Sequence, residues 1–167
     1  DGTEVSRDDG IRSDTTMERL ATLKPVFKED GKITAGNACP LNDGAAAVVV
    51  MDEDYARSLG IKPLARIIGS SVSGLDPKIM GVGPIEACRK VFAQTGMSVK
   101  DIDVIELNEA FAAQVIPVGR EVGFLDERLN PHGGALALGH PFGMTGARIM
   151  TTLINDLQTL DKTYGLE

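Results

Sequence analysis

The sequence is poor in the features that mark specialised environments. It has no tryptophan, and aromatic residues make up only 4% of its 167 positions, so aliphatic side chains must form the core. No apolar run approaches the roughly 20 residues that cross a membrane as a helix. Acidic residues outnumber lysine and arginine by 24 to 17, and the net charge of −7 argues against a nucleic-acid-binding protein.

Cysteine is equally scarce. Cys39 and Cys88 stand in unrelated contexts, with neither the spacing of metal ligands nor that of a disulfide framework. No metal site is therefore expected. The simplest setting for two unpaired thiols is a reducing compartment, and we predict a cytoplasmic protein.

Hydrophobic residues make up 43% of the chain, enough for a sizeable core. Their pattern predicts alternating strands and helices and therefore an α/β fold. The expected strands are Ala45–Met51, Leu64–Ser73 and Asp103–Leu107. The expected helices are Thr16–Leu23, a capped segment from Asp52 to about Leu59, Pro84–Gln94, Glu109–Val122 and about Gly143–Leu160.

The helix predicted at Glu109–Val122 is apolar almost all round, and Asn108 before it can serve as its cap. Such a helix is normally buried between layers. The chain supplies too few strands to cover it on both sides, and it begins at Asp1 without an initiator methionine. We therefore expect this chain to be part of a larger protein.

The most informative segment is Asn130–Gly146. Glycines at 133, 134, 139, 143 and 146 permit tight turns and close approach to a ligand, and they surround His140. Pro141 restrains the backbone just after it, and a predicted helix follows. A histidine presented in this way suits proton transfer or hydrogen bonding to a developing oxyanion. The simpler alternative is a loop histidine that caps the helix.

Asn130–Gly146 resembles the C-terminal signature of the thiolases, the 3-ketoacyl-CoA thiolases and acetyl-CoA acetyltransferases. Three further segments resemble elements of that family in the same order: Gly36–Gly44, Asp76–Pro84 and Asn108–Ala112. The resemblance extends over essentially the whole chain. It implies a layered αβαβα thiolase fold, with residues 1–41 ending the CoA-binding loop domain and residues 42–167 forming an incomplete C-terminal domain.

The resemblance also implies a function in lipid and fatty acid metabolism. A thiolase transfers an acyl group between an enzyme cysteine and coenzyme A, cleaving a 3-ketoacyl-CoA to acetyl-CoA or running the reverse Claisen condensation. CoA and acyl-CoA are then substrates, and no permanently bound cofactor is expected. The implied partners are the N-terminal half of the same enzyme and further copies in a homodimer or homotetramer.

Roles follow for individual residues. His140 would activate the nucleophilic cysteine and hydrogen-bond the thioester oxygen, while Asn108 would hold a water that completes the oxyanion hole. Other positions would contact CoA or the acyl chain; these are Arg12, Leu23, Phe27, Cys39, Met80, Phe111 and Gly139. Cys39 stands where many members carry a serine, and a thiol is the weaker hydrogen-bonding partner.

Neither of the two cysteines that thiolase chemistry uses is recognisable here, and the second is expected just beyond Glu167. The isolated chain is therefore predicted to be inactive. The alternative is a non-catalytic thiolase-like protein that binds acyl-CoA or a partner. A dinucleotide-binding dehydrogenase is excluded because Glu86 replaces the third glycine after Gly81-Val82-Gly83, and Gly69–Gly74 lacks the serine hydrolase spacing.

Overall fold

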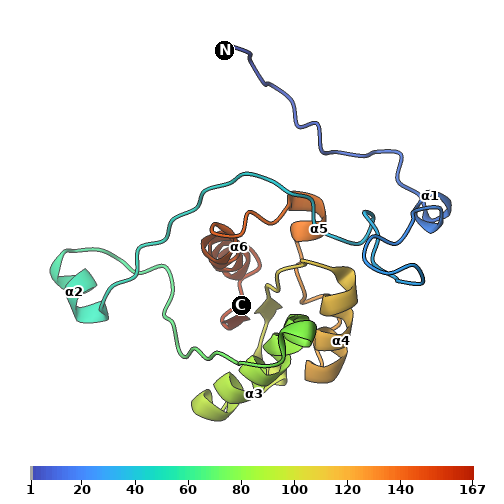
Figure 1. Cartoon of the computed structure of the whole chain (residues 1–167). Helices are drawn as coiled ribbons and strands as arrows, with labels where there is room; N and C mark the ends of the chain where they lie inside the picture. The colour runs from blue at the N-terminus through green and yellow to red at the C-terminus, as the bar shows by residue number, and fades with distance from the viewer. Residues whose placement is uncertain (1) are drawn as a thin grey trace.

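The computed structural model describes residues 2–167. Three helices surround two short parallel strands in the second half of the chain, whereas the first half is mostly extended and loops away from them (Figure 1). The surrounding helices are α3 (Gly83–Thr95), α4 (Ala112–Val122) and α6 (Thr145–Thr159), and the strands are β1 (Val104–Ile105) and β2 (Gly165–Leu166). The shorter elements are α1 (Met17–Ala21), α2 (Glu53–Ser58), η1 (Pro77–Val82), η2 (Val99–Asp101) and α5 (Ala135–Leu138).

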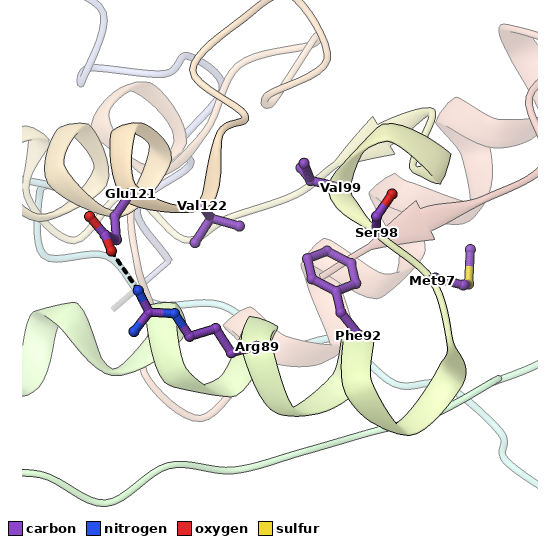
Figure 2. A pocket seen from close by; sticks show the side chains of 7 residues that line it. All are labelled: Arg89, Phe92, Met97, Ser98, Val99, Glu121 and Val122. Carbon is purple, nitrogen blue, oxygen red and sulfur yellow. Dashed lines mark hydrogen bonds and ion pairs between the residues drawn. The ribbon is translucent and has the colours of Figure 1, made fainter.

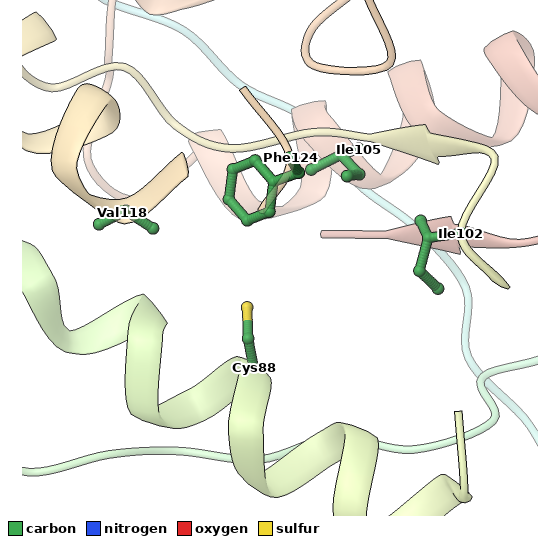
Figure 3. Close-up of a cluster of buried hydrophobic side chains, with 5 residues drawn as sticks. All are labelled: Cys88, Ile102, Ile105, Val118 and Phe124. Atoms are coloured by element: carbon green, nitrogen blue, oxygen red, sulfur yellow. The ribbon is translucent and has the colours of Figure 1, made fainter. Parts of the chain in front are cut away.

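The hydrophobic core lies where α3, α4 and β1 meet (Figure 3). Val118 of α4, Ile105 of β1 and Phe124 after α4 are at most 1% exposed. Cys88 of α3 completes this cluster, in keeping with the aliphatic, tryptophan-free composition. Its burial raises the pKa of the Cys88 thiol, so this side chain acts as a packing group.

Strand β1 is central because both of its edges are used. It pairs in parallel with β2, in the register Val104 to Gly165 and Ile105 to Leu166, and Ile105 forms a bridge to Leu129 on the other side. Helix α6 packs on both strands. Leu153 of α6 lies so close to Gly165 that a Cβ there would stand 2.7 Å from the leucine side chain.

The predicted helices are confirmed, with ends explained by their caps. Asp52 accepts hydrogen bonds from the backbone N–H groups of Asp54 and Tyr55 at the start of α2, at 3.0 and 3.1 Å. Gly96 ends α3 with a φ of +72°, a conformation that glycine adopts without strain. The third predicted strand is confirmed as β1, although only two residues satisfy the pairing.

The two strands predicted at Ala45–Met51 and Leu64–Ser73 are wrong for this chain. Both segments are extended, but neither has a backbone hydrogen-bonding partner within residues 2–167. Val49 and Val72 are 84% and 85% exposed. A β-strand requires a hydrogen-bonded neighbouring strand, and the described chain contains no segment that pairs with either of these two.

The start of α4 also differs from the prediction. Asn108 does not cap it; residues 108–111 lie outside the helix, and the N-cap position is Phe111. The reason is a competing interaction, because Ala110 accepts a backbone hydrogen bond from Cys39 and Ala112 donates one to Asn37. Helix α4 is buried on one side through Val115, Val118 and Gly119 and is uncovered elsewhere, as the shortage of strands led us to expect.

A buried acid lies directly after β1. Glu106 is 1% exposed, neither of its carboxylate oxygens has a hydrogen-bonding partner in the described residues, and Arg148 approaches only to 3.6 Å. Burial raises the pKa of Glu106 from 4.5 to about 7, and the opposing effect of the Arg148 charge is smaller.

This pKa predicts a pH-dependent stability. Between pH 4.5 and about 7 the folded chain holds a proton on Glu106 that the unfolded chain releases, so this contribution is complete below pH 4.5 and is lost as the pH rises through 7. Glu106→Gln should remove that loss, which urea unfolding at several pH values would measure. Glu127→Gln, at an exposed position, is the control; equal pH profiles for the wild type and Glu106→Gln would contradict the prediction.

Candidate active site

His140 lies in the loop between α5 and α6 and is half-buried. Its Nδ1 is 2.7 Å from the hydroxyl of Thr145, the first residue of α6. That hydroxyl, itself buried, donates its one proton to the carbonyl of Pro141 at 3.0 Å. With the hydroxyl proton directed at Pro141, the oxygen of Thr145 accepts a hydrogen bond from Nδ1–H of His140, since a hydroxyl has a single proton to donate. In that tautomer Nε2 of the uncharged ring keeps a lone pair.

The surroundings of His140 are open and partly aromatic. The ring of Phe142 lies 4.9 Å from the imidazole between centroids, tilted by 52°, and Phe142 is 77% exposed. A hollow of about 420 Å³ adjoins this loop, lined by residues 42–46 on one side and Pro141–Met144 on the other. The histidine thus stands beside a space that a ligand can enter.

Gly139 is required by its position before His140. Its φ of +89° lies in a region that other residues avoid, and the side chain of Asn42 occupies the place where a Cβ would stand. The segment that carries Asn42 and the loop that carries His140 therefore touch directly. This contact joins the start of the predicted C-terminal domain to the loop of His140.

Asn108 follows β1 in an extended segment. The carbonyl oxygen of its side chain is buried and has no hydrogen-bonding partner among the described residues. Within residues 2–167 no hydrogen bond joins Asn108 to His140. A buried amide oxygen without a partner is costly unless water or a ligand completes it, so this position is suited to holding a water molecule.

Four of the other predicted site residues gather at the start of α4. Phe27 meets Phe111 edge to face with ring centroids 5.9 Å apart, and the backbone of Cys39 is bonded to Ala110. Leu23 lies nearby, against Gly36. Phe27 is 68% exposed, which leaves one edge of this aromatic pair open to a ligand.

Met80 belongs to η1 and is 74% exposed. This element packs on α4, where Gly81 lies against Gln114 of the first turn. Arg12 lies in the N-terminal segment, which extends away from the helices in Figure 1. The structure therefore joins Leu23, Phe27, Cys39 and Phe111 in one area and leaves Arg12 apart.

Three residues of the site escaped the sequence analysis, although all lie in the motifs. Thr145 orients His140, while Glu109 and Asn130 hydrogen-bond each other at 2.8 Å beside Asn108. A hydroxyl residue at the start of a helix, five positions after the histidine, was the available signal for Thr145. Glu109 and Asn130 are 21 residues apart in sequence, and no local pattern indicates that they meet.

A second hollow, of about 330 Å³, lies between the C-terminal ends of α3 and α4 (Figure 2). Its floor is apolar, and at its edge Arg89 forms an ion pair with Glu121 (Figure 2). Glu121 belongs to the last turn of α4, whereas the aromatic pair stands at the first. Within residues 2–167 no helix has the length and hydrophobicity of a membrane span, and no three His, Cys, Asp or Glu side chains are grouped as a metal site.

An α/β scaffold that presents an imidazole from a glycine-rich loop offers a group suited to acid–base chemistry. Comparison with known proteins specifies it further. Residues 1–54 match the thiolase N-terminal domain and residues 61–167 the thiolase C-terminal domain. The chain belongs to the thiolase family, and its fold is the thiolase fold.

Individual relatives agree. The chain is 48% identical over 159 residues to a probable acetyl-CoA acyltransferase of Staphylococcus epidermidis, covering 95% of this chain and 40% of that protein. A crystal structure of the Bacillus anthracis acetyl-CoA acetyltransferase matches 96% of this chain and 41% of its own, with a TM-score of 0.90 and 48% identity. Human mitochondrial 3-ketoacyl-CoA thiolase in complex with CoA matches 96% and 41%, with a TM-score of 0.85 and 43% identity. The chain thus spans less than half the length of these relatives.

The Thr145 contact predicts the tautomer of His140. The neutral ring should carry its proton on Nδ1, and Thr145→Val, which keeps the shape but lacks the acceptor, should return it to the Nε2-protonated form that free histidine favours. Nitrogen chemical shifts of the imidazole measure this directly. Thr145→Ser should retain the Nδ1 proton, and an Nε2-protonated ring in the unaltered chain would contradict the assignment.

Proposed function

We propose that the complete protein containing this chain is a thiolase, either a 3-ketoacyl-CoA thiolase or an acetyl-CoA acetyltransferase. The observation that carries the proposal is the Nδ1 bond to Thr145, which leaves Nε2 of His140 as a base within the family signature Asn130–Gly146. Relatives named acetyl-CoA acyltransferase and 3-ketoacyl-CoA thiolase, at 48–52% identity, support it.

In the proposed reaction Nε2 of His140 accepts the proton of a cysteine thiol from the other half of the enzyme. The thiolate attacks the 3-keto carbon, the bond between C2 and C3 breaks, and C2 takes a proton from the second cysteine and leaves as acetyl-CoA. The thiol of CoA then gives its proton back to that cysteine, its sulfur accepts the acyl group, and the first cysteine is restored. Once protonated, Nε2 donates to the developing oxyanion together with a water held by the unpartnered oxygen of Asn108.

The substrate in this proposal is CoA or acyl-CoA, with no permanently bound cofactor and no metal. The relative crystallised with CoA supports the class of substrate. We assign the pantetheine and acyl contacts to the group at the start of α4, and to Met80 and Gly139. Arg12 remains a proposed contact to the phosphate end of CoA. This residue belongs to the extended N-terminal segment (Figure 1).

The proposed partner is the N-terminal half of the same enzyme. The extended segments Ala45–Met51 and Leu64–Ser73 support this, because their unpaired backbone and exposed valines would be satisfied by neighbouring strands. We also propose the domain boundary between residues 41 and 42, a homodimeric or homotetrameric assembly, and a cytoplasmic location. The cytoplasmic location is proposed because both cysteines are free thiols, the form that a reducing compartment maintains.

The chain by itself should not form an acyl-enzyme. Cys88 is buried with a raised pKa, which leaves little thiolate, and Cys39 lies outside the family's cysteine motifs. Incubation with acetyl-CoA followed by intact-mass measurement should leave the mass of the chain unchanged. A stable increase by one acetyl group, absent from a Cys39→Ser variant, would overturn this part of the proposal.

His140→Ala in the complete enzyme should lower kcat by about 10²- to 10⁴-fold, since it removes the general base and an oxyanion donor. His132→Gln is the matched control, because the side chain of the only other histidine is 58% exposed and pairs with Asp156 instead. An unchanged kcat for His140→Ala would sink the assignment. Binding of CoA without turnover in the unaltered protein would favour a non-catalytic relative.

A further inference from the structure

The glycine-rich run is fastened to the segment after β1 by one carboxylate. Oε1 of Glu109 accepts a hydrogen bond from Nδ2 of Asn130 at 2.8 Å, and Oε2 accepts one from the backbone N–H of Leu136 at 3.1 Å. The carboxylate lies over Gly134, where an added Cβ would stand 2.6 Å from each oxygen. Gly134 therefore provides the space that Glu109 occupies.

Asn130 supplies a second set of hydrogen bonds that hold the glycine-rich run. Its side chain accepts from the backbone N–H of Leu107 and donates to the carbonyl of Leu107, both at 2.9 Å, and its own N–H bonds Ile105 at 2.8 Å. Asn130 is 8% exposed and has a φ of +46°, a left-handed conformation that asparagine tolerates. These bonds hold the glycine-rich run against the end of β1.

Asn108 and His140 lie at opposite ends of this arrangement. Asn108 stands between Leu107 and Glu109, and both of these neighbours are bonded to the glycine-rich run. On the other side, Leu136 belongs to α5, whose backbone bonds from Gly139 to Ala135 and from Leu138 to Gly134 lead directly to His140. The neighbours of Asn108 are thus hydrogen-bonded to the glycine-rich run, and the short helix α5 links that run to His140, although Asn108 and His140 do not bond each other.

We propose that Glu109 is a positioning residue that sets the spacing between Asn108 and His140. This inference rests on the proposed function, in which those two residues share an oxyanion. Both carboxylate oxygens already accept hydrogen bonds from protein donors, so Glu109 acts through the two residues and not as a proton carrier. Bonds to a carboxylate are stronger than those between neutral groups, which suits a fixed spacing.

The test is Glu109→Gln in the complete enzyme. The variant keeps the shape but places an NH2 group against either Asn130 or Leu136, so one of the two bonds is lost. Because a displacement of about 1 Å at such a site can cost about 10²-fold, kcat should fall by about 10- to 100-fold. KM for the acyl-CoA should change less than threefold, which corresponds to a free-energy difference below about 0.65 kcal/mol. Glu121→Gln, at the far end of α4, is the control and should leave kcat unchanged.

A double variant separates positioning from general damage to the fold. If Glu109 acts through His140, adding Glu109→Gln to His140→Ala should lower kcat by less than twofold further. A full additional 10-fold loss, or an unchanged kcat in Glu109→Gln alone, would overturn the inference. If His140→Ala itself retains activity, the proposed function fails instead. Should Glu109→Gln not fold, Glu109→Asp, with a carboxylate one methylene shorter, is judged by the same criteria.

Discussion

The hydrogen bonds between Asn130 and the backbone of Leu107 hold the glycine-rich segment that carries His140 against the end of β1. They attach a glycine-rich segment, which has little side-chain surface of its own to bury, to a strand whose other edge pairs with β2. Glycine-rich segments lose much conformational entropy when they become ordered. The polar bonds to β1 and to Glu109 offset that cost where hydrophobic packing cannot.

The remaining structure divides into a packed part and an open part. Helices α3, α4 and α6 bury their apolar sides on β1 and β2, and this part contains the site loop. Residues 42–76 contribute extended segments with exposed valines and only the short helix α2. The site draws on both, because Asn42 from the open part contacts Gly139 in the packed part. The geometry of the site therefore depends on what packs against residues 42–76.

Structural features that depend on residues close in sequence were predictable, whereas those that depend on distant residues were not. Helices α2 and α3 were predictable because Asp52 and Gly96 act within a few residues of the ends they define. Ala45–Met51 was mistaken for a paired strand because its apolar pattern describes a strand's preference and not the presence of a partner. The start of α4 moved to Ala112 because Asn37 and Cys39, about 70 positions earlier, bond its expected first turn.

The same distinction holds at the site. His140 was recognisable from the glycines and proline around it, whereas the function of Glu109 depends on Asn130 and Leu136, which no periodicity brings to it. The prediction that Phe27, Phe111 and Cys39 contact the substrate came from the family resemblance alone. As a single residue, Phe111 would have been assigned to a core.

Thr145 has two tasks at once, as the first residue of α6 and as the acceptor for Nδ1 of His140. The orientation of the imidazole is therefore tied to the position of a whole helix. That helix is in turn seated on β2 by Leu153 against Gly165. The packing of α6 on β2 therefore contributes to the orientation of the His140 ring, although β2 and His140 do not touch.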